Sequence, residues 1–397
     1  MTWLDSPLLP AITAFVLALP GCDNDPCDDA PGSVCTWAGV KGQRGYNGDG
    51  LDRQESWLAF PSDLTFDPQG APWIVDWNNH RIRRVEADGT LTTTIGNDQE
   101  GDGSPGETDR LPVGNPSGAD AQDVSLNHAT DIEFAPDGTV VLAAWHNNKI
   151  RVMDPDSGVL TVLAGDSYGY SGEGTPAWQA VFNQPKAIVV DDDGGIILTD
   201  QRNQRVRRIE PDGERLIRTI AGVGTLGYTG DGGPALAAEF AFDGGVTPTP
   251  SGALALRGNE LFVADSENHR IRRIDLESGE ITCIAGDGEA VAFGDGGAAL
   301  DASLGYPRDI EFGPDGRLYV ADGSANSVRA IDLGSGMIDR VAGTGEACEG
   351  YFNCFEEAEG GSALDLRFSD PYGIAFDAEG RLYVADTNNS RIVRIVP

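Results

Sequence analysis

Basic residues are scarce in this chain: it has 28 Lys and Arg against 63 Asp and Glu, which gives a formal net charge of −35 over 397 residues. A field of this sign repels phosphate backbones and anionic lipid headgroups. Nucleic acids and acidic membrane surfaces are therefore excluded as expected partners. The acidity suits solubility, cations or basic partners instead.

Long apolar runs are also lacking. The run Leu8–Leu19 is too short to span a bilayer, which requires about 20 residues, but it fits the hydrophobic region of a signal peptide. It ends in Leu-Pro-Gly-Cys at Cys22, which resembles a bacterial lipobox. We therefore expect a signal peptide over residues 1–22, lipidation of Cys22, and an exported protein held to the cell envelope by that lipid alone. Ordinary cleavage, giving a secreted protein, is the alternative.

The chain has six cysteines, and their spacings match no zinc site. Cys27 and Cys35 flank the start of the folded region, and Cys348 and Cys354 lie in one loop-like stretch. In an oxidising compartment each pair is a predicted disulfide. Cys283 lies in a strand pattern and is predicted to be a buried free thiol.

Glycine, in contrast, is abundant, with 53 residues placed between short runs of β-forming residues. This pattern favours many short strands joined by tight turns. One block recurs six times: a strand, a tight polar loop and a second strand, as in IVDWNNHRIRRV. The copies begin at Ile74, Leu142, Ile197, Phe262, Tyr319 and Tyr383. Such a repeat predicts stacked supersecondary units rather than separate domains.

Each copy is preceded by a strand that ends in an Asp/Pro/Gly turn, as in SDLTFDPQG from Ser62, and five copies are followed by a strand such as VLTVLAG from Val159. Each unit thus supplies four strands, A, B, C and D. The sixth unit stops after strand C, and SVCTWAG from Ser33 matches the missing strand D. A terminal strand that completes the last unit closes a ring and leaves no unpaired edge. We predict an all-β, six-bladed β-propeller with four-stranded blades over residues 33–397, preceded by a linker over residues 23–32.

The motifs AG, GY-x-GDGG-PA, YVAD and N-x-RIR-x-I recur in this order, and the sequence resembles the NHL-repeat family of six-bladed propellers, in particular exported bacterial members, over Ser33–Pro397. The second unit departs most, because Ala144 replaces the recurrent Asp and the loop before it is divergent. The recurrent Asp and Arg, such as Asp265 and Arg270, are interpreted as architectural, with the Asp accepting loop N–H groups.

In such blades the D-to-A and B-to-C loops share one face, here called the loop face, and the short A-to-B and C-to-D turns share the other, the turn face. Binding residues gather on long loops over a rigid scaffold, so we expect the ligand at the loop face. Trp77 and Trp145, in equivalent loops of adjacent blades, are candidates for a platform that binds a sugar ring or a peptide side chain. Tyr46 and Tyr228, which precede Gly-Asp-Gly in D-to-A loops, are further candidates. Packing against neighbouring loops is the alternative role for all four.

One acidic loop resembles a calcium site. Asp98, Glu100, Asp102 and Asp109 fall at ligand positions of an EF-hand-like loop, with glycine at its sixth position. The flanking helices of an EF-hand are missing, and the last ligand is Asp instead of Glu. Calcium is the one cofactor that the sequence suggests.

Catalysis is left open by the sequence, which offers no convincing catalytic residue. The peptidyl-hydroxyglycine lyases are NHL-type propellers that hold a central metal with histidines, so the resemblance implies His80 and His269, expected across the ring from each other, as candidate metal ligands. The favoured function is nevertheless a monomeric, exported and membrane-tethered binding or scaffolding module, with a protein or carbohydrate ligand on its loop face. The alternative is a metal-dependent lyase or lactonase with a site in the central funnel.

Overall fold

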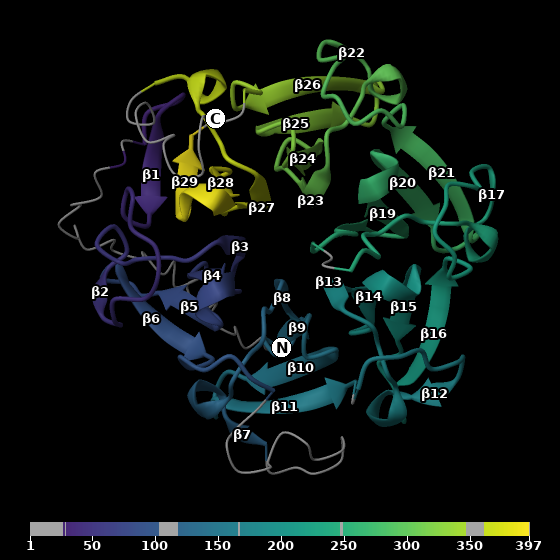
Figure 1. The fold of residues 1–397 in the computed structure, drawn as a ribbon, viewed down its shortest axis with the longest axis horizontal. Coiled ribbons are helices and arrows are strands. Elements are labelled where there is room, and N and C mark those ends of the chain that lie inside the picture. Colours follow the sequence, from purple (N-terminus) through teal and green to yellow (C-terminus); the bar gives the residue numbers. More distant parts are fainter. Residues whose placement is uncertain are drawn as a thin grey trace, which may run out of the picture.

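The sheets of this protein form a ring of six blades around a central axis (Figure 1). A computed structural model describes residues 27, 29–102, 118–165, 167–246, 249–346 and 361–396. In every sheet strand A is innermost and strand D lies towards the rim. The predicted six-bladed β-propeller is thereby confirmed. The predicted signal peptide and Cys22 lie outside the described residues, and no helix within the described ranges is long and apolar enough to cross a membrane.

The four strands of each blade occur where the repeat predicts them. The A strands are β3 (Pro61–Phe66), β8 (Asp131–Phe134), β13 (Pro185–Val190), β18 (Leu254–Arg257), β23 (Pro307–Phe312) and β27 (Pro371–Phe376). The B strands are β4 (Pro72–Asp76), β9 (Val140–Ala144), β14 (Ile196–Asp200), β19 (Glu260–Asp265), β24 (Leu318–Asp322) and β28 (Leu382–Asp386). The C strands are β5 (Arg81–Val85), β10 (Lys149–Asp154), β15 (Arg205–Ile209), β20 (Arg270–Asp275), β25 (Ser327–Asp332) and β29 (Arg391–Ile395). The D strands are β6 (Thr90–Ile95), β11 (Val159–Ala164), β16 (Leu216–Ala221), β21 (Glu280–Ala285), β26 (Met337–Ala342) and β1 (Val34–Ala38).

Five blades carry a fifth strand that the repeat did not predict. Each is two residues long, lies in the D-to-A loop and pairs antiparallel with the D strand of the blade that the loop enters. These strands are β2 (Leu51–Asp52), β7 (Ala119–Asp120), β12 (Thr175–Pro176), β17 (Gly233–Pro234) and β22 (Gly297–Ala298). The long loops therefore cross to the rim before they return to the axis, and the pairing anchors them.

Short 3-10 helices occur at two kinds of loop position. Those at the end of strand B are η1 (Trp77–Asn79), η4 (Gln201–Asn203), η6 (Ser266–Asn268) and η9 (Thr387–Asn389). Those in the D-to-A loops are η2 (Ala121–Asp123), η3 (Ala177–Gln179), η5 (Ala235–Ala237), η7 (Ala299–Asp301) and η8 (Ala363–Asp365).

The hydrophobic core is divided among the junctions between blades. Buried apolar residues form six clusters, and each cluster joins strands of two adjacent blades. Because a blade is apolar on both faces, it is stable only between two neighbours. This dependence makes closure of the ring a condition for folding.

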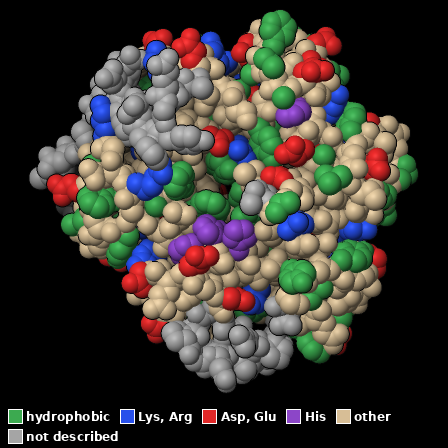
Figure 2. Space-filling view, in the orientation of Figure 1, with side chains coloured by type: hydrophobic (Ala, Val, Ile, Leu, Met, Phe, Trp, Pro, Cys, Tyr) green, Lys and Arg blue, Asp and Glu red, His purple; other side chains and the backbone are tan. Residues whose placement is uncertain are grey.

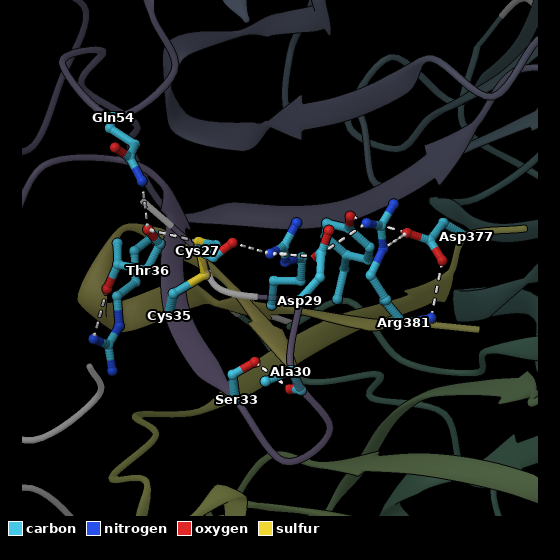
Figure 3. The surroundings of a disulfide bond; sticks show 12 residues. Cys27, Asp29, Ala30, Ser33, Cys35, Thr36, Gln54, Asp377 and Arg381 are labelled. Carbon is cyan, nitrogen blue, oxygen red and sulfur yellow. Dashed lines mark hydrogen bonds and ion pairs between the residues drawn. A yellow bond between two sulfur atoms is a disulfide. The ribbon is translucent and has the colours of Figure 1, made fainter. Parts of the chain in front are cut away.

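Strand β1 closes the ring by pairing antiparallel with β29 at the other end of the chain, with Val34 opposite Ile395 and Ala38 opposite Ile392. The predicted closure is confirmed. Cys27 and Cys35 form a disulfide with a Cα–Cα distance of 5.5 Å (Figure 3). Arg394 of β29 donates a hydrogen bond of 2.8 Å to the Cys27 carbonyl oxygen. Backbone pairing thus holds β1 in the sixth blade, and the disulfide fastens the segment ahead of β1 to that strand. Cys348 and Cys354, the other predicted pair, lie outside the described residues.

Removal of this disulfide by the double substitution C27A/C35A is expected to lower the free energy of unfolding by about 2 kcal/mol, because it closes a loop of only 8 residues. Chemical denaturation of the purified protein would measure the change. Cys283, a free and partly exposed thiol, provides the control. If Cys283→Ala destabilised as much as the double variant, loop closure would not be the cause.

Candidate functional site

The recurrent Asp at the end of strand B ties the loop face together. In blade 4 the buried Asp265 accepts a hydrogen bond of 2.8 Å from the backbone N–H of Ala241 in the D-to-A loop. Burial raises the pKa of Asp265 to about 6, and its hydrogen bonds and Arg272 oppose that rise. Arg272 lies 3.3 Å from Asp265 and 3.0 Å from Asp231 of the Gly-Asp-Gly motif. These residues hold the loops and form no open site.

The loop tyrosines pack on arginines. The ring of Tyr46 lies 3.9 Å from the Arg81 guanidinium, and that of Tyr228 lies 4.3 Å from the Arg270 guanidinium. Such cation–π contacts stabilise the loop against strand C. Both rings keep 38% exposure, so one side of each still faces solvent.

Asp102, a predicted calcium ligand, already pairs with two cations. Its carboxylate lies 2.5 Å from Lys149 Nζ and 3.0 Å from Arg151 Nη2. It therefore occupies the same structural role as Asp231 in blade 4. Asp98 and Glu100 are exposed, and Asp109 lies outside the described residues. Within the described ranges no group of three or more His, Cys, Asp or Glu side chains is placed to hold a metal ion, and calcium binding stays a prediction.

Three histidines meet on the loop face where blades 1 and 2 join, and we call His80, His128 and His146 the histidine cluster (Figure 2). The ring centroids of His80 and His128 are 4.6 Å apart, and those of His128 and His146 are 5.0 Å apart. His128 comes from the divergent D-to-A loop, and His146 follows strand β9. Sequence reasoning missed both residues.

His80 joins the two blades. It has a left-handed backbone (φ 54°), and its Nδ1 accepts a hydrogen bond of 3.4 Å from the backbone N–H of His128. Asn148 and Gln204 make the equivalent bond one and two blades further on. His80 therefore has a structural role that other polar residues also fill.

His269, the other predicted ligand, lies outside the histidine cluster. Its Nδ1 is 2.7 Å from the carbonyl oxygen of Gly305. The structure therefore does not pair His80 with His269. His80 and His269 occupy equivalent positions in blades 1 and 4, which lie on opposite sides of the ring. The histidine next to His80 is His128, which comes from the adjacent blade.

The two tryptophans pack inward and form no open platform. Trp145 is 1% exposed, stacks on His146 at 4.1 Å and donates a hydrogen bond of 2.9 Å to Gln201 Oε1. Trp77 lies 4.3 Å from His128 and 6.4 Å from Trp145, measured between ring centroids. Trp145 is buried and cannot form an exposed platform, so packing, the alternative role, holds for it. Trp77 is half-buried, and its role in ligand binding stays a prediction. The Trp77 Nε1–H is buried and makes no hydrogen bond in the structure.

Electrostatics keeps the cluster uncharged. Burial, together with the neighbouring His80 and His146, lowers the pKa of His128 to about 3. Burial also lowers the pKa of His80 and of His146, while the carboxylate of Glu100 opposes the shift. At neutral pH the three imidazoles are therefore neutral.

An acidic cavity of about 190 Å³ lies inside the ring, and we call it the axial channel. All six A strands line it, and five carboxyl groups face it from three of them. These are Asp63 of β3, Asp131 and Glu133 of β8, and Asp309 and Glu311 of β23. The pattern was visible in the sequence, since SDLTF, TDIEF and RDIEF place acids on one side of the inner strand.

Burial and mutual repulsion favour the protonated form of these acids. Burial raises the pKa of Asp309 to about 6 and that of Glu311 to about 8. The pKa of Glu133 is also raised, again chiefly by burial. Lys186, which is 6% exposed, opposes the rise for Asp309 and Asp131.

Glu311→Gln is expected to stabilise the protein at pH 8 and to have little effect at pH 4. The pKa of Glu311 in the folded protein, about 8, lies above its ordinary value of 4.5, so folding takes up a proton between these pH values. Stability therefore falls as the pH rises through this window, and the neutral amide removes that loss. We expect a gain of about 1–2 kcal/mol at pH 8 after allowance for screening.

Urea unfolding at pH 4, 6 and 8 would measure this effect. The exposed Glu280 of β21 provides the control, because Glu280→Gln removes a charge without relieving burial. An equal gain for Glu311→Gln at all three pH values would show that repacking, not proton uptake, is responsible.

The turn face has two larger hollows, one on each side of blade 2. Their volumes are about 740 and 780 Å³. The first has Val152 and Val190 in its walls and Asp137, Asp154 and Asp212 on its rim. The divergent blade therefore has hollows on the face where the sequence predicted only short turns.

Comparisons with known proteins agree with this architecture. Residues 368–395 match the family model of the NHL repeat. The chain is 28% identical over 363 residues to NHL repeat-containing protein 2 of Gallus gallus, which covers 84% of this chain and 46% of that protein. It is 29% identical over 236 residues to Teneurin-1 of Mus musculus, covering 56% of this chain and 8% of that protein. The chain thus spans about half the length, or less, of these relatives.

A solved structure shows the same fold. The crystal structure of an auxiliary nutrient binding protein from Bacteroides ovatus superimposes with a TM-score of 0.63 at 16% identity, covering 91% of this chain and 76% of that one. At this identity the likeness concerns the fold alone. The chain thus carries one segment that matches the NHL repeat, is similar in sequence to NHL repeat-containing proteins, and folds as a six-bladed ring.

Proposed function

We propose that this propeller is an exported binding or scaffolding module that engages its ligand through the loop face. The observation that carries the proposal is the half-buried, uncharged patch of the histidine cluster with Trp77 and Asn78, set in a strongly acidic molecule. A neutral, aromatic and hydrogen-bonding patch on a rigid ring suits a protein or carbohydrate ligand. The nutrient-binding description of the Bacteroides ovatus propeller is compatible with this function.

The patch contains one exposed polar side chain and one buried donor without a partner. Asn78 is exposed, and its Oδ1 lies 3.3 Å from His128 Nε2. The buried Trp77 Nε1–H lacks a hydrogen-bond partner in the structure. Buried polar groups without partners are uncommon and often mark functional positions. We therefore place the centre of the interface at the junction of blades 1 and 2.

A glycan array and a peptide array, probed with the labelled full-length protein, would test this placement. For any probe that binds, Asn78→Ala is expected to weaken binding at least tenfold, as expected for a residue at an interface centre. Thr139→Ala, in a hollow of the turn face, is the matched control and should leave binding unchanged. If Thr139→Ala abolished binding while Asn78→Ala did not, the turn face would be the working face.

We further propose that a lipid on Cys22 tethers the module to a membrane. The apolar run and the lipobox-like end of residues 8–22 support this proposal. Expression in a bacterial host with radiolabelled palmitate is expected to label the wild-type chain and to place it in the membrane fraction. Cys22→Ser should lose both the label and the membrane association. A labelled Cys22→Ser chain would contradict the assignment.

A further inference from the structure

We propose that blade 2 binds one late first-row transition-metal ion, of which Zn²⁺ is the representative, through His128 Nδ1, His146 Nδ1 and Asn127 Oδ1. The three atoms lie on two loops of a single blade. This inference shares the histidine cluster with the proposed function, but it requires no ligand on the loop face, so the metal titration described below tests it separately.

The three atoms form a compact triangle. His128 Nδ1 lies 3.1 Å from His146 Nδ1, and Asn127 Oδ1 lies 2.7 Å and 3.2 Å from these two nitrogens. Metal–nitrogen bonds of about 2.0–2.1 Å place adjacent ligands of one ion about 2.9–3.4 Å apart, from octahedral to tetrahedral geometry. The triangle thus has nearly the dimensions of one face of a coordination polyhedron. Water molecules would fill the other coordination positions of the ion.

The donor set selects the class of ion. Imidazole nitrogen suits zinc, copper and nickel, whereas calcium and magnesium prefer sites made of oxygen alone. His128 Nε2 lies 3.3 Å from Asn78 Oδ1, which can accept the ring proton on Nε2 when Nδ1 binds the ion.

The rings are held in place before any ion binds. Trp77 packs against His128, and Trp145 stacks on His146 with an interplanar angle of 21°. Contacts that surround a ligand side chain in this way orient it and limit its rotation. His80 is not part of the triangle, because its Nδ1 accepts the backbone N–H of His128.

Access and charge also favour a cation. Both ligand histidines are half-buried, so an ion can reach them from solvent. The exposed carboxylate of Glu100 interacts electrostatically with His146. In the absence of an ion, imidazole N–H groups directed at Asn127 Oδ1 hold the same triangle together. A metal ion would replace those hydrogen bonds.

Isothermal titration of the EDTA-treated, full-length protein with Zn²⁺ tests the proposal. Millimolar Mg²⁺ in the buffer occupies weak carboxylate sites. We expect one Zn²⁺ per chain. Co²⁺ in place of Zn²⁺ should give visible absorption without thiolate charge-transfer bands, and Cu²⁺ should quench tryptophan fluorescence because Trp77 and Trp145 contact the ligands.

His146→Gln is expected to weaken Zn²⁺ binding by more than about 100-fold, since loss of an outer partner alone costs 10–100-fold. His269→Gln removes a histidine outside the cluster and should bind as the wild type does. Asn127→Asp supplies a charged oxygen and should bind Zn²⁺ about tenfold more tightly, which keeps the test decisive if His146→Gln fails to fold. Absence of a stoichiometric site in the wild type, equal weakening by His269→Gln, or no gain with Asn127→Asp would overturn the proposal.

Discussion

Replacing Arg272 by alanine is expected to lower the free energy of unfolding by about 3–5 kcal/mol. Arg272 is fully buried in β20 and lies 3.3 Å from the equally buried Asp265. It also donates hydrogen bonds of 2.6 Å to the carbonyl oxygen of Glu239 and of 2.8 Å to that of Thr229. Alanine would remove the cationic partner of the buried Asp265 carboxylate and the donor to two loop carbonyl oxygens. Buried polar groups that lose such partners lower the stability of the fold.

The next residue in the same strand provides the control. Arg273 points to the other side of the sheet and pairs at 3.1 Å with Glu260, and its side chain is 42% exposed. Exposed ion pairs contribute about 0–1 kcal/mol, so Arg273→Ala should cost no more than that. Urea or guanidinium denaturation would compare the two variants. Similar losses for both would mean that the buried network adds nothing beyond a surface pair.

The second large effect is expected at the closure of the ring. Val393→Pro should abolish cooperative folding of the propeller, because Val393 lies in β29 between Thr36 of β1 and Val384 of β28. Proline removes a backbone donor and clashes within a sheet, which costs about 3 kcal/mol or more. With blade 6 broken, blades 1 and 5 each lose a neighbour, and the loss spreads around the ring.

A proline that the backbone accepts is the matched control. Ala298 has φ −67° and ψ 133°, and the equivalent position of two other blades is already Pro176 or Pro234. Ala298→Pro is therefore expected to be neutral or slightly stabilising. Circular dichroism melting and limited proteolysis would separate the two outcomes. A cooperative melt of Val393→Pro near the wild-type temperature would show that closure is dispensable.

The sequence was sufficient to predict the strands and their ring, for a physical reason. Each copy repeats the same apolar alternation and the same turn residues, so the predicted A strand at Ser62 and D strand at Val159 fall within β3 and at the start of β11. The sixth unit lacks its own strand D, and the matching segment near the amino terminus identified the closing strand at Val34. The fifth strands were missed because two residues carry too little pattern to distinguish them from loop.

The candidate site was predictable only in part. The repeat locates His80 within its blade, but it does not reveal which loop of the next blade packs against it. That loop supplies His128 and is the most divergent in the chain, so no repeated pattern describes it. Trp145 was a candidate for a binding platform because it lies in a B-to-C loop, whereas stacking on His146 buries it. The axial acids were detectable, since Asp131 and Glu133 alternate along one inner strand.

The disulfide beside the closing strand also determines how the ring would carry mechanical force. A pull applied to the chain ahead of Cys27 would pass through the sulfur–sulfur bond to Cys35, within β1. From there the load would spread over the row of hydrogen bonds between β1 and β29 instead of peeling the strand from its end. A molecule tethered by its amino-terminal segment would in this way resist unravelling while its axis remained free to tilt.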